Sequence, residues 1–367
     1  MAFVYRHLVR RYPGRYRMLI APNLYAVLNQ GGYGLDQLEG VEVLAARSHL
    51  DRKRGSDAPV LVNVGRVATL LRYRARTEAW AKAQALDVIQ IYLEMVPFLG
   101  VIPLRGQAMI ASLVSHLPVY FNRRSVRSRL LRRAIDRSMK ADCLYLPIVE
   151  GLRRIGVDEA KLNWPFRNTT NHEAFSPRPK EPLVSFTARA IRWKNPNLMT
   201  FVIDRVSQAH PSTRFAVLGQ GPLQRGLRRV VQERGWQDKV IVGYQADPSD
   251  IVNRSLAHVS IEEFDNAPNQ SLLEGMAAGC AVIASDVGAT SSVVTPDVGV
   301  LTGLEPEEVA RRVIALLDDP DRAKALGRAA RDRILRDHHV DRYVEYLNLL
   351  HDFSHTEPVQ HGRRITA

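Results

Sequence analysis

The second half of the chain alternates short apolar runs with longer segments of helical periodicity. Six runs have the length and composition of buried strands, at residues 183–187, 215–218, 240–242, 258–261, 281–284 and 300–301. Helical patterns lie between them, at about 196–209, 222–234, 248–254, 271–278 and 306–317, and several open with a proline. This alternation predicts a parallel, doubly wound α/β sheet.

The first half follows the same alternation, with predicted strands at 16–20, 41–44, 60–62, 88–92, 109–113 and 143–146. Three prolines between 175 and 182 predict an extended linker. A chain of 367 residues exceeds what one hydrophobic core usually supports. We therefore expect two Rossmann-like domains, at 1–176 and 177–338, followed by a helix at 339–354 and a disordered tail at 355–367.

Positive charge is concentrated in the first half. Residues 1–175 hold 27 Lys and Arg against 14 Asp and Glu, whereas the rest holds 24 of each, so the net charge of +13 lies before residue 176. Much of it falls in 122–140, where apolar residues near helical spacing predict a basic amphipathic helix. Such a helix binds an anionic membrane surface or an acidic acceptor, or it packs its apolar stripe on the sheet and leaves its charges in solvent. The segment has no interleaved aromatic residues, which argues against nucleic acid as a partner.

Cysteine content and hydropathy indicate a cellular compartment. Cys143 and Cys280 are too few for a disulfide framework and too far apart in sequence for a metal-binding motif. The amino terminus has no signal-peptide pattern, and no uninterrupted apolar run is long enough to span a bilayer. We expect a cytoplasmic protein, soluble or peripheral on the inner face of the membrane.

The segment 258–288 carries the most chemistry. An apolar strand runs into the turn Glu263-Phe-Asp-Asn-Ala-Pro-Asn269, a short helix bearing Glu274 follows, and a small-residue strand leads to Gly288. In a parallel α/β sheet, ligands bind at the carboxyl ends of the strands. The segment therefore brings a carboxylate and the free N–H groups of a helix N-terminus to that edge, which suits a nucleotide sugar.

This segment resembles the donor-site signature of family 4 glycosyltransferases of the GT-B fold. In that family an acid, a Pro-Asn turn and a second glutamate precede an Ala-Met-Ala-x-Gly-x-Pro-Val-Ile-Ala-Ser run, and the matching run here is Glu274-Gly-Met-Ala-Ala-Gly-Cys-Ala-Val-Ile-Ala-Ser285. Asn168, Asn171 and Phe175 are similar to the family's interdomain element. The resemblance implies two Rossmann-like domains facing a central cleft, a final helix that returns to the first domain, and a retaining transferase that uses nucleotide sugars.

Two cations follow the first strand of the second half. Arg189 and Lys194 have the spacing of the family's Gly-Arg-Leu-x-x-x-Lys element, and cations there neutralise a departing diphosphate. The resemblance implies that both are catalytic and that no metal is needed, because helix N-termini supply further positive charge. The alternative is a surface pair beside the linker, and Arg192 is able to substitute for either residue.

Glycines follow the next two strands, in Gly219-Gln-Gly221 and Gly243-Tyr244. Glycine lets a phosphate or ribose approach the backbone, although a lone Gly-x-Gly is equally consistent with a tight turn. The resemblance assigns these glycines to the nucleotide, with Tyr244 stacking on the base or packing against the protein.

The acid pair departs from the family pattern. Asn266 stands eight positions before Glu274, where the family has its first acid, so we assign that role to Asp265 with one extra residue in the turn. By resemblance Glu274 accepts hydrogen bonds from the ribose hydroxyls. The alternatives are an Asx turn at Asp265 and a helix-dipole partner at Glu274. The implied donor site is completed by Asn266, Pro268, Asn269 and Leu273.

In the first half, His116 follows an apolar strand, and the resemblance implies a catalytic histidine near the sugar and the acceptor. A structural histidine is the alternative, and Glu94 is a rival polar group after the preceding strand. Residues 1–12 already have a helical pattern, so the family's first strand and glycine-rich loop have no counterpart before them. We expect an N-terminal domain that lacks its first strand, or a chain that begins downstream of its natural start.

The sequence thus predicts a metal-independent retaining glycosyltransferase that moves a hexosyl or other glycosyl group from a UDP- or GDP-type donor to an acceptor hydroxyl, without a bound cofactor. Family habit and the basic surface point to an envelope glycan or a lipid-linked acceptor. The alternative is a noncatalytic protein of the same fold that binds nucleotide sugars or a membrane surface, favoured by the missing loop and the altered first acid. A Rossmann dehydrogenase fits worst, because no Gly-x-Gly-x-x-Gly follows a first strand.

Overall fold

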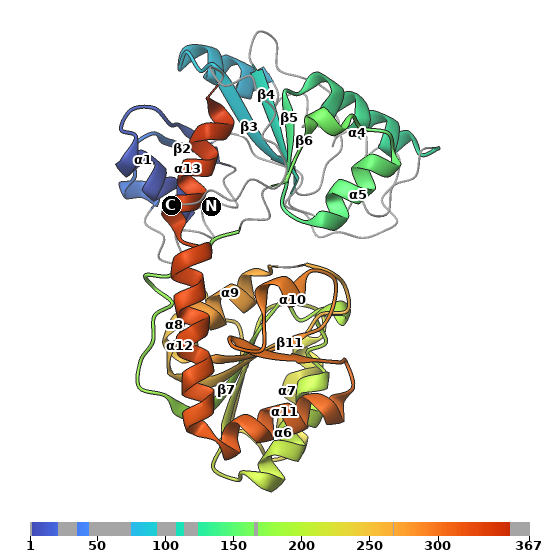
Figure 1. Ribbon diagram of the computed structural model, residues 1–367, viewed down its shortest axis with the longest axis vertical. Coiled ribbons are helices and arrows are strands. Elements are labelled where there is room, and N and C mark those ends of the chain that lie inside the picture. Colours follow the sequence, from blue (N-terminus) through green and yellow to red (C-terminus); the bar gives the residue numbers. More distant parts are fainter. Residues whose placement is uncertain are drawn as a thin grey trace. The chain divides into compact units, whose positions relative to one another are not determined.

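The structure is a computed structural model that describes residues 2–20, 35–43, 75–93, 108–113, 124–164, 168–266 and 268–352. The chain forms two compact units (Figure 1). The first contains Met1–Phe166 and Glu345–Ala367, and the second contains Arg167–Val344. Helix α13 (Val340–His351) therefore begins in the second unit and ends in the first.

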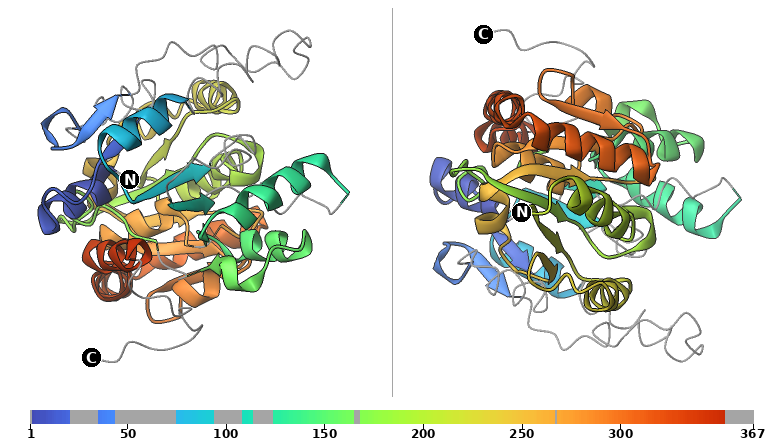
Figure 2. Two further views of the ribbon diagram at one scale, coloured as in Figure 1. Left: turned by 90° about the horizontal axis from the view of Figure 1, so that it is seen from above. Right: turned by 90° about the horizontal axis from the view of Figure 1, so that it is seen from below.

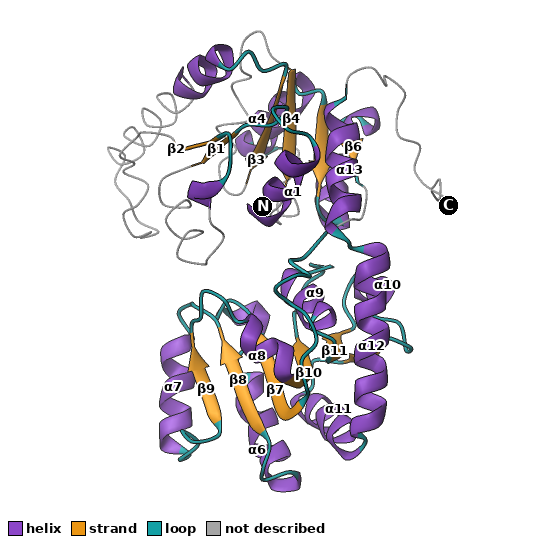
Figure 3. Ribbon diagram, turned by 90° about the vertical axis from the view of Figure 1, so that its left-hand side faces the viewer, coloured by secondary structure: helices purple, strands orange, loops and turns teal. Residues whose placement is uncertain are grey.

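A six-stranded parallel sheet forms the centre of the second unit, with the spatial order β12-β11-β10-β7-β8-β9 (Figure 3). The six strands predicted for this half are confirmed. Their bounds are β7 (Glu181–Thr187), β8 (Arg214–Leu218), β9 (Val240–Gly243), β10 (Ser255–Ser260), β11 (Ala281–Ser285) and β12 (Gly299–Thr302). The strand order reverses between β7 and β10, and open α/β sheets bind ligands at such a point, beyond the carboxyl ends of the strands.

Helices connect these strands and cover the sheet. They are α6 (Leu198–Ala209), α7 (Gln224–Glu233), α8 (Ser249–Arg254), α9 (Gln270–Ala277), α10 (Thr290–Val293), α11 (Pro306–Asp318) and α12 (Pro320–Asp337). Helices α6 and α11 pack side by side (Figure 2). The apolar stripe of α6, including Met199 and Val202, is buried with Phe186 and Phe215 of the sheet. Each such side chain stabilises the fold by roughly 1.5–3 kcal/mol, which outweighs weak local helix propensity.

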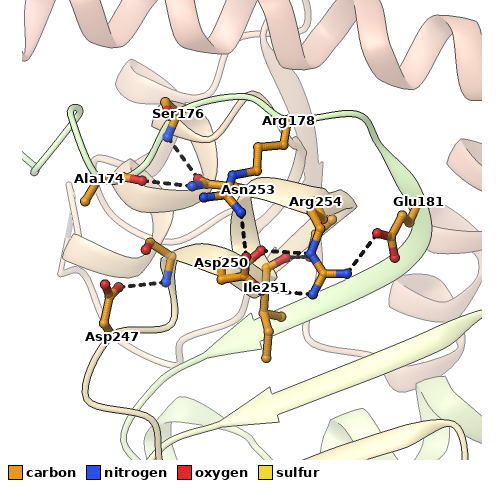
Figure 4. A network of polar contacts seen from close by, with 11 residues as sticks. Ala174, Ser176, Arg178, Glu181, Asp247, Asp250, Ile251, Asn253 and Arg254 are labelled. Carbon is orange, nitrogen blue, oxygen red and sulfur yellow. Dashed lines mark hydrogen bonds and ion pairs between the residues drawn. The ribbon is translucent and has the colours of Figure 1, made fainter.

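The segment that leads into β7 is held to α8 by polar side chains (Figure 4). The Asn253 amide donates to the Ala174 carbonyl at 2.8 Å and accepts from the Ser176 N–H at 2.9 Å. Arg254 pairs with Glu181 at 2.8 Å and with Asp250 at 3.0 Å. These contacts fix the approach to the central strand of the sheet.

Pro182 lies inside β7 and not in the linker that we expected around 175–182. A proline normally disrupts a central strand because it removes a ladder N–H group. Here the pairing with β10 is irregular at that point, since Ser255 pairs with Glu181 whereas Ala257 pairs with Val184. The proline is tolerated because it coincides with this shift of register.

The first unit contains two described parallel sheets. One pairs β1 (Met18–Ile20) with β2 (Val41–Val43), and the other follows the order β3-β4-β5-β6. The strands of the larger sheet are β3 (Val88–Leu93), β4 (Ala108–Leu113), β5 (Lys140–Cys143) and β6 (Leu162–Asn163). The helices of this unit include α1 (Ala2–Arg11), α4 (Val126–Arg137) and α5 (Leu146–Arg154).

The predicted strand at 143–146 is wrong at its carboxyl end. Strand β5 ends at Cys143, and Leu146 begins α5. Pro147 lies in the first turn of that helix, where its fixed φ favours helix initiation and its missing N–H costs nothing. The basic helix predicted over 122–140 is confirmed as α4, although Lys140 already belongs to β5. The predicted strand at 60–62 and the tail at 355–367 lie outside the described residues.

A buried polar network anchors the end of α13 to the larger sheet of the first unit. Asp142 of β5 accepts hydrogen bonds from the hydroxyls of Tyr346 and Ser112, the latter at 3.0 Å. His351 lies 2.8 Å from the Gln90 side-chain oxygen. Burial raises the pKa of Asp142, and the two hydroxyl hydrogen bonds oppose that shift. Within the described ranges, no helix has the length and hydropathy of a transmembrane span.

Candidate functional site

The loops after β7, β8 and β9 are joined by backbone hydrogen bonds at the carboxyl edge of the second sheet. The Ala190 N–H donates to the Gln220 carbonyl at 2.8 Å, and the Gly219 N–H donates to the Gly243 carbonyl at 2.7 Å. A Cβ at position 219 would lie 1.7 Å from the Ala188 carbonyl oxygen, and one at 221 would lie 2.3 Å from that of Ala190. Gly219 and Gly221 are therefore required by the close approach of a neighbouring loop. Gly243 is less constrained, because its Cβ would meet only Arg228, at 3.6 Å.

The two predicted cations differ in environment. Arg189 is exposed, and its Cζ atom lies 5.8 Å from the centroid of the Trp193 ring. Lys194 is buried at the end of a short 3-10 helix (Arg192–Lys194), and its Nζ atom lies 4.6 Å from the same centroid. The chain then turns at Asn195, whose left-handed φ of 49° suits an asparagine. Arg189 is thus accessible to a ligand, whereas Lys194 supports the loop from inside.

Lys194 forms a buried ion pair with Glu262, a residue that the sequence analysis did not single out. Its Nζ atom lies 2.6 Å from a Glu262 carboxylate oxygen, and the two side chains are 11% and 4% exposed. Burial lowers the pKa of Lys194 and raises that of Glu262, while the mutual attraction of the pair opposes both shifts. The pair ties the loop after β7 to the loop after β10. The sequence feature that could have identified Glu262 as a site residue is its position directly after the carboxyl end of a buried strand.

Asp265 and Asn266 lie in the same turn. A Cβ at Gly288 would lie 2.0 Å from the Asp265 Cγ atom, so the carboxylate packs directly against Gly288, whose φ is +54°. An Asn266 side-chain hydrogen bond lowers the pKa of Glu262 and so partly offsets the effect of burial. The turn is therefore fixed both to the buried ion pair and to the loop after β11.

The start of α9 is positioned by Asn269 and Pro268. The Asn269 side chain caps the helix by accepting from the Leu272 N–H at 2.8 Å, and it donates to the Ser260 hydroxyl at 3.0 Å. The Pro268 carbonyl accepts from the Asn168 amide at 3.2 Å. Leu273 is placed in the core, with its side chain fully buried and its N–H bonded to the Asn269 carbonyl.

Glu274 lies on α9 and is partly exposed. Desolvation raises its pKa to about 7, the negative charge of Asp247 adds to the shift, and a Gln270 hydrogen bond opposes it. A carboxyl group that titrates near neutral pH in this position is able to accept hydrogen bonds from ligand hydroxyls when ionised.

A neutral histidine lies beneath α9. His258 is fully buried, its Nδ1 atom lies 2.9 Å from the Ser185 hydroxyl, and its Nε2 atom lies 3.0 Å from the Ser271 hydroxyl. Ser271 also contacts the Thr187 hydroxyl at 2.8 Å. Burial, with a smaller effect of the Lys180 charge, lowers the pKa of His258 to about 4. This network connects the first turn of α9 to the ends of β7 and β10.

The second unit thus collects most of the predicted site residues on loops along one edge of its sheet. Tyr244 directly follows β9 and is 49% exposed. Positions 116 and 94 lie outside the described residues, so the structure places neither His116 nor Glu94. Among the residues that are described, no three His, Cys, Asp or Glu side chains gather as a metal site.

The two units, each built on parallel α/β sheets, have the GT-B fold. Residues 168–333 match the family model described as Glycosyl transferases group 1.

The relatives and solved structures agree with this assignment. Over 166 residues the chain is 26% identical to a GDP-mannose-dependent monoacylated alpha-(1-6)-phosphatidylinositol monomannoside mannosyltransferase of Corynebacterium glutamicum, and the match spans only 42% of that relative's length and 42% of this chain. The fold is similar to that of Anabaena HepE in complex with UDP-glucose, with a TM-score of 0.72, 15% identity and coverage of 95% of this chain and 94% of that one. A glycosyltransferase from Rickettsia africae has a TM-score of 0.65, 14% identity and coverage of 95% and 93%.

Proposed function

We propose that this protein is a retaining glycosyltransferase that moves a sugar from a nucleoside diphosphate sugar to an acceptor hydroxyl without a catalytic metal. The observation that carries the proposal is the grouping of exposed Arg189, the Lys194–Glu262 pair and the start of α9 on loops of β7 and β10. These strands flank the point where the strand order reverses. A diphosphate suits that position, because an arginine and free helix N–H groups both attract negative charge.

In the proposed reaction the bond between the sugar C1 atom and the β-phosphate oxygen breaks, and the acceptor oxygen bonds to C1 on the same face. The acceptor proton passes to the departing β-phosphate, which leaves as the nucleoside diphosphate. Arg189 and the N-terminus of α9 stabilise the negative charge that grows on this leaving group. Lys194 adds positive charge from inside the loop, and His116 is assigned by resemblance to the sugar and acceptor side.

The nucleoside is assigned to the other side of β7. By resemblance, Gly219, Gly221 and Gly243 line its site, and exposed Tyr244 offers a ring for stacking on the base. Ionised Glu274 accepts hydrogen bonds from the ribose hydroxyls. The named ligands of the similar proteins, GDP-mannose and UDP-glucose, support a GDP- or UDP-type donor.

The proposed acceptor is a precursor in envelope glycan or glycolipid synthesis, and the transfer takes place at the inner face of the membrane. The corynebacterial relative is named for a phosphatidylinositol mannoside acceptor, which supports a lipid-linked saccharide. Helix α4 supports membrane contact, because it exposes Arg129, Arg132, Arg133 and Arg137. Leu131 and Ile135 are buried on its opposite face, so its attraction to a membrane is mainly electrostatic.

The test is release of nucleoside diphosphate from a panel of UDP- and GDP-sugars, with and without lipid-linked saccharide acceptors. Transfer that depends on an acceptor supports the proposal, and the anomeric configuration of the product, read by NMR, decides whether it is retained. Tight binding of a nucleotide sugar with no transfer to any acceptor would favour the noncatalytic alternative.

A further inference from the structure

Two aromatic side chains lie together beside Arg189 and Lys194. Trp193 belongs to the loop after β7, and Phe264 belongs to the loop after β10. Their ring centroids are 6.4 Å apart with an interplanar angle of 54°. Phe264 is 51% exposed, although Glu262, two residues earlier, is 3% exposed. The two rings therefore form an apolar surface next to strongly polar groups.

The positions of these rings are fixed by the loops that carry them. The Glu263 N–H donates to the Trp193 carbonyl at 3.0 Å, directly before Phe264 in the chain. The buried Lys194–Glu262 pair joins the same two loops at 2.6 Å. Trp193 also lies beneath the charges of Arg189 and Lys194, at 5.8 and 4.6 Å from its ring centroid. Isolated exposed apolar residues are common on protein surfaces, but Phe264 is held in a defined position by these contacts between the two loops.

We infer that Phe264, with Trp193 beside it, is the platform on which the pyranose ring of the donor stacks. This inference rests on the proposed function and deepens it. One face of a pyranose presents C–H groups of slight positive charge, which pack favourably on the negative face of an aromatic ring.

The order of the strands indicates that the sugar, and not the base, of the donor contacts Phe264. Strands β8 and β9, whose loops carry the glycines and Tyr244, lie on one side of β7, and β10 lies on the other. With the diphosphate at Arg189 beyond β7, the base extends toward β8 and β9. The sugar, which is attached to the β-phosphate, then lies over the loop after β10 and contacts Phe264.

The test compares each nucleotide sugar with its own nucleoside diphosphate. Calorimetric titration of the full-length protein with UDP, UDP-glucose, GDP and GDP-mannose gives the affinity added by each sugar. Phe264→Ala should weaken binding of the preferred nucleotide sugar about 3- to 10-fold, the range expected for loss of one aromatic contact, and leave the parent nucleotide within about twofold. Phe264→Tyr should bind like the wild type, because it retains the ring.

Phe201→Ala is the matched control. Phe201 is also an exposed aromatic residue, at 38%, with Arg205 at 5.6 Å from its ring, but it lies on α6. It should change no affinity, and unchanged unfolding temperatures should show that all three variants are folded. Three outcomes would overturn the inference and leave the proposed function standing. In the first, Phe264→Ala weakens the binding of nucleotide and nucleotide sugar equally. In the others, it weakens the binding of neither, or it raises only the KM for the acceptor. A wild-type protein that binds none of the four ligands would overturn both.

Discussion

The imidazole of His258 occupies the space in which any larger residue at Gly275 would place its Cβ atom. A Cβ there would lie 2.5 Å from the His258 Cδ2 atom and 2.6 Å from Cγ. The ring has little freedom to move, because it is buried and contacts both Ser185 and Ser271. This explains why glycine stands inside α9, where the resembling family has alanine.

We predict that Gly275→Ala destabilises the protein. Alanine gains about 1 kcal/mol in helix propensity, whereas overpacking a buried site costs roughly 1–3 kcal/mol, so the net loss should be about 1 kcal/mol. In a His258→Ala background the contacts with the ring are removed and only the Cβ atom of residue 258 remains close, at 2.9 Å, so the same change should destabilise less. Urea denaturation of the four proteins in this double-mutant cycle measures the coupling. Stabilisation by Gly275→Ala in the wild type would contradict the packing described here.

Arg189 and Lys194 should separate into a catalytic and a supporting cation. Because Arg189 is exposed, Arg189→Ala should leave the free energy of unfolding within about 0.5 kcal/mol. It should nevertheless lower kcat/KM about 100- to 1000-fold, since a group that stabilises the leaving charge is removed. Unchanged transfer rates with the correct donor would exclude that role.

Lys194→Met should instead destabilise the protein by about 3–5 kcal/mol, because it leaves the Glu262 carboxylate buried without its cation. Adding Glu262→Gln should recover part of that loss, since the remaining charge is then removed as well. Denaturation midpoints of the single and double variants provide the measurement. A double variant less stable than Lys194→Met alone would show that burial of the charge is not the cause.

Glu274 should make donor binding depend on pH. Its pKa of about 7 in the folded protein exceeds the ordinary glutamate value, so the folded state binds this proton more tightly than the unfolded state. Its contribution to stability is therefore fully present below about pH 4.5 and is lost as pH rises through 7. Donor affinity should follow the opposite trend, because the ionised carboxylate is the better acceptor for ribose hydroxyls.

Nucleotide titrations between pH 5.5 and 8.5 check the prediction for Glu274. Affinity should fall as pH decreases through about 7, and Glu274→Gln should flatten the profile. Asp247→Asn should move the midpoint to lower pH, because the Asp247 charge contributes to the raised pKa. An unaltered profile in Glu274→Gln would assign the dependence to another group.

Helix α4 should bind anionic vesicles through its exposed arginines. Each basic residue near such a surface contributes about 1 kcal/mol, so replacing Arg129, Arg133 and Arg137 with Gln should weaken binding about 100-fold. Co-sedimentation with phosphatidylglycerol vesicles measures this, with phosphatidylcholine vesicles for comparison. The matched control replaces Arg225, Arg228 and Arg229, three exposed arginines of α7, and should have a small effect. Equal losses in the two triple variants would indicate that only net charge matters.

The sequence was most informative about the sheet of the second unit. Strands β7, β8, β10 and β11 are buried over most of their length on both faces, so each appears as a largely apolar run between turn residues. Strand β5 has no such run, because it contains Lys140 and Asp142. Asp142 is accommodated in the interior by the hydroxyl of Tyr346, about two hundred residues later, and no local pattern reveals such a partner.

The candidate site shows the same limit. The spacing of Arg189 and Lys194 was visible in the sequence, and the structure places both on the loop after β7. Whether a charged side chain faces solvent or the interior depends on partners from other strands, however. Glu262 was overlooked for this reason. Its burial is compensated by Lys194, and from the sequence the neighbouring acidic residues were equally plausible as partners of that lysine.

The hydrogen bonds between the loops of Ala190 and Gln220 and between Gly219 and Gly243 involve main-chain atoms alone. A scaffold assembled in this way keeps its shape whatever side chains it displays, provided that the two crowded glycines persist. Substrate preference can therefore drift in evolution at exposed positions such as 192 and 220 without loss of folding. Engineering of new donor selectivity should begin at those positions.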